Sequence, residues 1–242
     1  MVDGQAVDWN IFDTRLKDAL EETEGETVVV TPSMKSPAEL SILNKFLTKY
    51  KATHIAYDAL SMSALYKANE ATHGVATNSE YDFEKANIVV SLEADFLGTF
   101  GNSVANTKQY SKRRNPKHES GMNQHFQIES MMPLTGSNAD FRYTKSTADQ
   151  RDILLAILAA VSNFQHTVKS ENKEIVTKII TALNENKGKS LVVAGANDLN
   201  IQVIVNKINS ALDNYGQTIT VAKKVAEVLA DDEKFENLIG RM

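Results

Sequence analysis

Two carboxylate side chains, Glu93 and Asp95, follow directly after the run Ile88–Leu92, which reads IVVSL. A short apolar run of this kind predicts a buried strand. Ligands of parallel α/β sheets bind beyond the carboxyl ends of the strands, so these two acids stand where chemistry is expected. We expect their side chains to point to opposite sides, which makes them a poor acid/base pair, although one of them could face a cleft.

Other polar side chains stand at the ends of further expected strands. Lys35 follows the run Thr27–Thr31, close to a helix start where backbone amides favour an anion, although Pro32 and Pro37 remove two donors. If the chain binds a ligand, we expect an open polar pocket at these strand ends. Its boundary residues would be Lys35, Glu93, Asp95, Asn138 and Asn197.

Several familiar motifs are absent. Gly188-Lys189-Ser190 resembles the end of a phosphate-binding loop, but Leu183 replaces the first glycine and a strand follows where a helix should. The sequence contains no G-x-S-x-G elbow, and its five histidines show no H-x-x-x-H or H-x-H spacing. We therefore predict neither a Ser/His/Asp hydrolase nor a metal site.

Composition excludes other classes of function. The 242 residues include no cysteine, which excludes disulfides, iron–sulfur clusters and thiolate zinc sites. The net charge of −5 argues against a general nucleic-acid binder. The longest basic cluster, Lys112-Arg113-Arg114 with Lys117, is interpreted as a solvated helix end. The chain shows neither an 18-residue apolar run nor a signal peptide at its N-terminus.

The elements that must position these side chains alternate along the chain. Five short β-branched or apolar runs predict strands at 27–31, 53–57, 88–92, 125–129 and 190–194. Helices are expected at 9–20, after the capping boxes at Ser36 and Ser146, and at 61–72, 103–114, 170–186, 198–212 and 221–238. This alternation predicts an α/β fold, with Rossmann-like, mainly parallel sheets and helices on both faces.

The expected organisation is a larger Rossmann-like subdomain at 1–167 and a smaller α/β portion at 168–242. The polar stretch around 167–172 marks the boundary between them. The segment from Glu129 to Arg142 is expected to be a long connection with two methionines, Leu134 and Phe141. It is either a packed crossover loop or a surface for a ligand or partner.

Three segments carry a family resemblance. Phe83–Leu97 is similar to the "ADVIVSFGADFL" stretch of molybdopterin oxidoreductases, and Met132–Asp140 to "MSLTGANAD" in the large iron–sulfur subunit of alternative complex III. Gly188–Gly195, with Asn206, Asn209, Ala211, Leu212, Asn214 and Gly216, resembles "GKSLVVAG…LNAALGNVGKT". Alternative complex III is a bacterial quinol:electron-acceptor oxidoreductase, and the resemblance covers about Thr27 to Thr220.

The resemblance implies a molybdopterin-oxidoreductase-like fold that has lost its cofactor and serves as a scaffold, while iron–sulfur clusters lie in another part of the subunit. It implies partners among the other domains and subunits of a membrane electron-transfer complex, on the periplasmic side of the inner membrane. The chain lacks cluster cysteines and an export signal. Glu129-Ser130-Met131 replaces the cofactor-gripping "DPR" stretch, and the helix expected from Val221 has no counterpart in the family.

Two hypotheses follow, and whether this chain alone is an enzyme stays open between them. The first is a non-catalytic structural and interaction domain, a fragment of that iron–sulfur subunit, with no cofactor of its own. Exposed apolar side chains should then form docking surfaces, with Leu97, Phe100, Met131, Met132 and Phe141 as candidates. The second is an oxidoreductase domain that retains a pterin, such as molybdopterin, or a nucleotide in the strand-end cleft.

Overall fold

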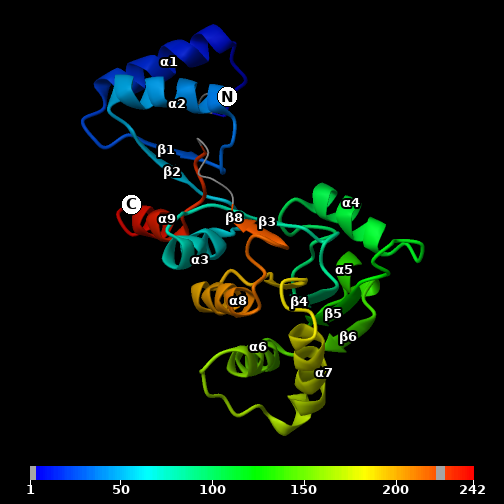
Figure 1. Cartoon of the computed structure of the whole chain (residues 1–242). Helices are drawn as coiled ribbons and strands as arrows, with labels where there is room; N and C mark the ends of the chain where they lie inside the picture. The colour runs from blue at the N-terminus through cyan, green and yellow to red at the C-terminus, as the bar shows by residue number, and fades with distance from the viewer. Residues whose placement is uncertain (1–3, 222–226) are drawn as a thin grey trace. The chain divides into compact units, whose positions relative to one another are not determined.

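The computed structural model of the protein describes residues 4–221 and 227–242 (Figure 1). It consists of two compact units, one formed by residues 1–63 with 225–242 and the other by residues 64–224. We call these unit 1 and unit 2. The boundary expected near residue 167 lies inside unit 2, in the segment that connects the helix at 147–161 to the short 3-10 helix at 170–172.

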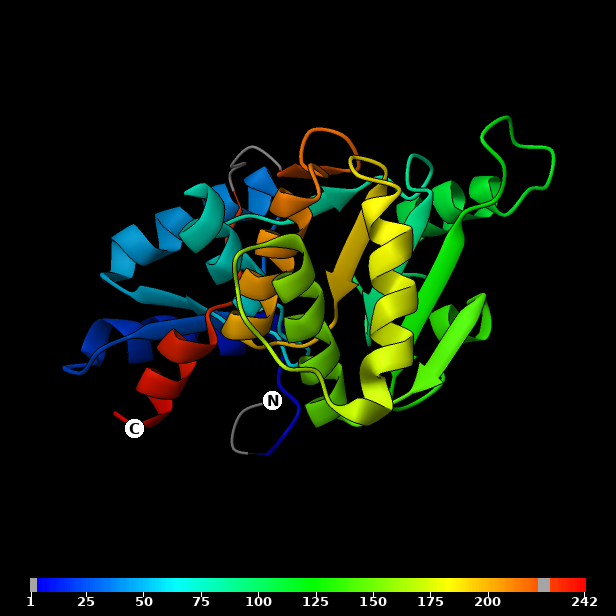
Figure 2. The same cartoon turned by 60° about the horizontal axis from the view of Figure 1, so that its bottom comes forward.

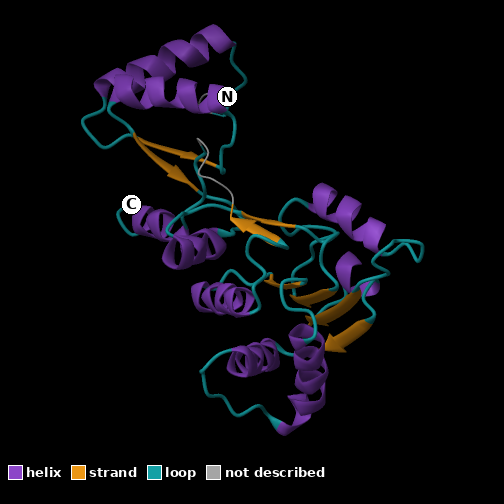
Figure 3. Ribbon diagram, viewed as in Figure 1, coloured by secondary structure: helices purple, strands orange, loops and turns teal. Residues whose placement is uncertain are grey.

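In the part of unit 1 that the structure describes, a two-stranded parallel sheet is accompanied by three helices, coloured by type in Figure 3. In chain order its elements are α1 (Trp9–Glu22), β1 (Val28–Thr31), α2 (Pro37–Tyr50), β2 (Thr53–Ala56) and α9 (Asp232–Ile239). Helix α2 starts as its capping box predicts, with the Ser36 hydroxyl accepting a hydrogen bond from the Glu39 amide. Helix α9 joins the unit by stacking Phe235 on Tyr57, with 4.0 Å between ring centroids.

Unit 2 is built on a four-stranded parallel sheet in the order β6-β5-β4-β7. Its strands are β4 (Ile88–Leu92), β5 (Gln124–Glu129), β6 (Phe141–Thr144) and β7 (Ser190–Ala194). Its helices are α3 (Ser63–His73, which begins at the unit boundary), α4 (Ser103–Arg113), α5 (Leu134–Ser137), α6 (Thr147–Val161), η1 (Ser170–Asn172), α7 (Lys173–Asn184) and α8 (Leu199–Ala211). A second, antiparallel pair joins β3 (Ser79–Tyr81) to β8 (Ile219–Val221).

This arrangement confirms the expected α/β fold with a mainly parallel, Rossmann-like sheet. One face of the sheet packs its apolar side chains, among them Val90 and Ile128, against α6, α7 and α8 (Figure 2). The other face meets α4, where Tyr110 contacts the ring of His125. The strand order places β7 on the opposite side of β4 from β5 and β6, so the topology switches direction between β4 and β7.

Three expectations were wrong. Residues 227–231 are not helical, so the expected helix at 221–238 is replaced by α9; residues 222–226 lie outside the described part of the chain. The connection expected between Glu129 and Arg142 contains the short helix α5 and the start of β6. Arg113 is only 2% exposed rather than solvated. Its guanidinium donates to the backbone oxygens of Glu84 and Gly121 and to Asn87.

Over the described residues, no helix is both long enough and apolar enough to cross a membrane.

Candidate functional site

The Glu93 carboxylate, at the end of β4, is held by two neighbouring segments. Its Oε1 atom accepts hydrogen bonds from the Ser130 amide at 2.7 Å and from Gln150 Nε2 at 2.8 Å. Burial raises the pKa of Glu93, but these hydrogen bonds outweigh burial and hold the pKa below its ordinary value. Glu93 has a φ of +54°, a left-handed conformation that ends the strand. The carboxylate therefore joins the loop after β5 to helix α6.

The Asp95 carboxylate is bound on the other side of the strand end. Its Oδ1 atom accepts hydrogen bonds from the Thr135 amide at 3.1 Å and the Thr135 hydroxyl at 2.6 Å. In a regular strand, residues two apart would share a face, but the turn at Glu93 removes that constraint. Glu93 and Asp95 bond to different segments, Glu93 to the loop after β5 and Asp95 to the start of α5.

The remaining residues of the expected pocket do not join them. Asn138 donates to the Leu134 carbonyl at 2.8 Å and caps its own short helix α5. Asn197 accepts a hydrogen bond from the Ala64 amide at 3.0 Å. Lys35 belongs to unit 1, whereas the other four residues belong to unit 2. None of the five lines the pocket that the sheet edge contains.

That pocket lies between the carboxyl ends of β4 and β7, where the topology switches. We call it the β4–β7 pocket; its volume is about 330 Å³. Three buried side chains, Leu92, Leu154 and Ala194, form its apolar part. The other lining residues come from the starts of α6 and α8 and the loop before α8, namely Thr147, Ala148, Gln150, Arg151, Ala196, Asp198 and Ile201. This is the position that open α/β sheets use for ligands.

The sequence did not predict this pocket, because the pocket forms only where β4 and β7 are neighbours in the sheet. The segments after β4 and β7 were correctly expected at one edge, but only the strand order places these two ends side by side. The available signals were the helix starts at Ser146 and Asp198. Both are N-caps whose side chains accept hydrogen bonds from amides of the first helical turn.

A buried polar row runs along β5 on the sheet face opposite the core. His125, Gln127 and Glu129 alternate along the strand and therefore share this face. His125 Nε2 lies 3.1 Å from Gln127 Oε1, and Gln127 Nε2 donates to Glu129 Oε2 at 2.8 Å. Since the amide oxygen only accepts, His125 must donate from Nε2. Arg142 Nε completes the row by donating to Glu129 Oε1.

Burial dominates the electrostatics at the start of this row. It lowers the pKa of His125 to about 4, although the hydrogen bond to Gln127 works in the opposite direction. It also raises the pKa of Tyr110, whose hydroxyl lies 3.1 Å from His125 Nδ1, to about 12. Both groups are therefore neutral near pH 7. At the far end, a Cβ atom on Gly136 would collide with the Glu129 carboxylate, so glycine lets α5 approach the row.

An exposed apolar surface follows β5. Met131 and Met132 are 80% and 64% exposed, and Leu134 lies beside them in sequence, also exposed. We call these three residues the methionine surface. Of the other expected docking residues, Phe141 is half-buried against Phe126 and Leu97 is half-buried. The expectation was wrong for Phe100, which is buried near Tyr81.

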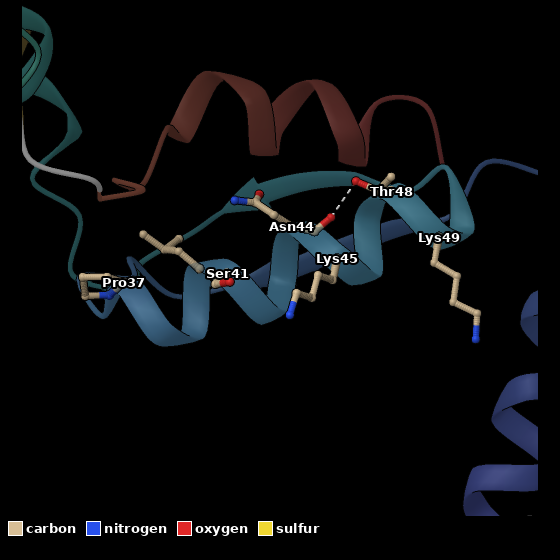
Figure 4. Close-up of a pocket in the computed structure, with 7 residues that line it drawn as sticks. Pro37, Ser41, Asn44, Lys45, Thr48 and Lys49 are labelled. Carbon is tan, nitrogen blue, oxygen red and sulfur yellow. Dashed lines mark hydrogen bonds between the residues drawn. The ribbon is translucent and has the colours of Figure 1, made fainter.

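Unit 1 carries a wide, open hollow along α2, with a volume of about 660 Å³ (Figure 4). Figure 4 draws its polar side chains with the Thr48 hydroxyl bonded to the Asn44 carbonyl at 2.8 Å. Lys45 and Lys49 extend away from the helix in this view. An open helix face with exposed ammonium groups does not specify a ligand, so we assign no site here.

Within the ranges 4–221 and 227–242, no three His, Cys, Asp or Glu side chains gather closely enough to hold a metal ion. No protein-family model and no curated protein matches this chain.

Proposed function

We propose that this chain is a non-catalytic structural and interaction domain of a membrane-associated respiratory electron-transfer complex. Its partners would be other domains and subunits of that complex, on the periplasmic side of the inner membrane. The observation that carries the proposal is that both strand-end carboxylates are already hydrogen-bonded within the protein. Glu93 and Asp95 are bonded to Ser130, Gln150 and Thr135, which fastens the loops of the sheet edge together.

A bis-pterin molybdenum cofactor does not fit the residues at this edge. The chain offers no cysteine to molybdenum. Asp95, which follows the end of β4, already accepts two hydrogen bonds from Thr135. The alternative function, an oxidoreductase domain that retains a pterin or nucleotide, needs polar groups able to bind several charged groups of the ligand. The β4–β7 pocket instead has an apolar floor of Leu92, Leu154 and Ala194.

The methionine surface supports the interaction role. Exposed large apolar side chains that follow one another at a sheet edge are a frequent mark of a protein interface. Methionine is flexible and polarizable, so it adapts to the shape of a partner. We propose that Met131 and Met132 contact a neighbouring domain or subunit of the complex.

One test asks whether the chain carries the cofactor. The protein is purified from a host that makes molybdopterin and is analysed for molybdenum, tungsten and the fluorescence of oxidised pterin. We expect none of the three signals above background. A stoichiometric metal or pterin signal would overturn the scaffold function and favour the alternative.

The second test asks whether the chain docks in a membrane complex. Tagged protein is produced in its native organism, and detergent-solubilised membranes are separated on native gels stained for quinol oxidation. We expect the tag to migrate with the stained complex, and M131S/M132S to lose that migration while keeping its circular dichroism. M122S is the matched control, because Met122 is also exposed but lies elsewhere. If the unaltered chain migrated separately from the stained complex, the proposal would be contradicted.

A further inference from the structure

The side chains that line the β4–β7 pocket do not fill it. Its floor is apolar and buried, formed by Leu92, Leu154 and Ala194, while Ile201 adds an apolar wall. A volume of about 330 Å³ is at the lower end of the range for ligand pockets, roughly 300–1,000 Å³. The pocket therefore suits a compact apolar group rather than a dinucleotide.

The α6 side of this pocket is suited to a negative charge. Arg151 lines the pocket, is exposed, and makes no hydrogen bond or ion pair with any residue the structure describes. Helix α6, 15 residues long, begins beside it. Its cap, Ser146, accepts a hydrogen bond from the Asp149 amide, and among the described residues no side chain accepts one from the amides of Thr147 and Ala148 at the pocket. The positive end of the helix dipole adds to the charge of Arg151.

The α8 side differs. Asp198 contributes a carboxylate to the pocket lining, and its Oδ1 atom accepts a hydrogen bond from the Ile201 amide. The negative charge of Asp198 repels an anion from this side. A ligand with one anionic end is therefore oriented toward Arg151 and α6. A ligand with several negative charges is disfavoured.

We propose that the β4–β7 pocket binds a small aliphatic monocarboxylate, with its chain on Leu92, Leu154 and Ala194 and its carboxylate at Arg151. This site is independent of the docking role proposed above, because the methionine surface lies at the end of another strand. The geometry assigns a binding function and no chemical step. An aliphatic acid of about eight carbons combines the required apolar body with a single charge.

The test is an NMR titration of the methyl-labelled, full-length protein with octanoate. We expect saturable shifts of the methyl signals of Leu92, Leu154 and Ala194, with a Kd of about 1 mM or tighter. 1-Octanol, which has the same chain without the charge, should bind about tenfold more weakly.

Two variants at exposed positions locate the site without disturbing the core. R151Q should weaken octanoate binding about tenfold, because it removes a charge-assisted hydrogen bond. A148L should abolish binding by placing a larger side chain in the pocket. K207Q is the control, since it removes an exposed positive charge from α8 outside the pocket.

Three outcomes would overturn the proposal. The first is no saturable shift of the pocket methyl signals at millimolar octanoate. The second is octanoate affinity in R151Q and A148L equal to that of the unaltered protein, which would place binding elsewhere. The third is equal affinity for octanoate and 1-octanol, which would remove the carboxylate from the assignment. None of these outcomes would change the native-gel result, so the two proposals are tested separately.

Discussion

The two faces of β5 bury their side chains in different ways. On one face, Phe126 and Ile128 pack into a continuous apolar core with α6, α7 and α8. On the other face, His125, Gln127 and Glu129 form a hydrogen-bonded row in which each member needs a specific partner. Apolar packing tolerates substitutions of similar volume, whereas a buried polar row is stable only when all of its groups are satisfied.

This difference indicates that the two faces contribute differently to stability and to the positions of the surrounding elements. The apolar face supplies most of the burial and hence most of the stability. The polar face fixes the positions of α4, α5 and β6 through directional contacts, such as the one between Tyr110 and the Asn138 carbonyl. Changes on the apolar face should thus show large effects that do not depend on pH. Changes on the polar face should show smaller effects that depend on charge.

The largest effect is expected from the apolar core. Leu183 is fully buried in α7, and L183A removes apolar contacts and leaves a cavity. We expect the free energy of unfolding to fall by about 3 kcal/mol, measured by urea unfolding followed by circular dichroism. L134A, at a leucine that is 58% exposed, should change it by less than about 0.5 kcal/mol. Equal costs for the two variants would mean that the core is not packed as described.

A smaller, pH-dependent effect is expected from His125. Its pKa is about 4 in the folded protein and about 6.5 when unfolded, so below pH 6.5 the unfolded chain binds more protons. Stability therefore falls as the pH drops. Between pH 6.5 and 4.5 this one group should cost about 2 kcal/mol. In H125F that part of the loss should disappear.

The measurement is the free energy of unfolding of both proteins across this pH range. Burial also lowers the pKa of His54 and His73, so part of the slope should remain in H125F. H54F provides the comparison for a less buried histidine. If H125F kept the full slope, the burial of His125 would not be the cause.

Much of the fold could be predicted from local sequence, because its signals are local. The capping box at Ser36 and the β-branched runs each specify an element without reference to distant residues. Strand β6 was missed because Phe141–Thr144 is short and half-polar, and it is a strand only because it pairs with β5. Arg113 was misplaced because two of its partners, Glu84 and Asn87, lie 29 and 26 residues away in sequence. The β4–β7 pocket required the strand order.

The smallest effect, and the most direct test of the polar face, concerns Glu129 and Arg142. Glu129 is 1% exposed, and its carboxylate receives one hydrogen bond from Gln127 and one from Arg142. R142M removes the counter-charge and leaves a buried carboxylate with one donor. Removing one member of a fully buried pair costs about 3–5 kcal/mol, but water reaches the Arg142 side of this pair. We therefore expect a loss of about 1–2 kcal/mol in the free energy of unfolding.

The second substitution decides between charge and packing. E129Q replaces the carboxylate by a neutral amide of nearly the same shape, so it no longer needs the cation. If charge explains the cost of R142M, the double variant R142M/E129Q should be more stable than R142M alone. If Arg142 contributes only through the packing of its side chain, adding E129Q should give no recovery. Recovery by E129Q would establish that the polar face of β5 depends on matched charge, whereas the apolar face depends on volume.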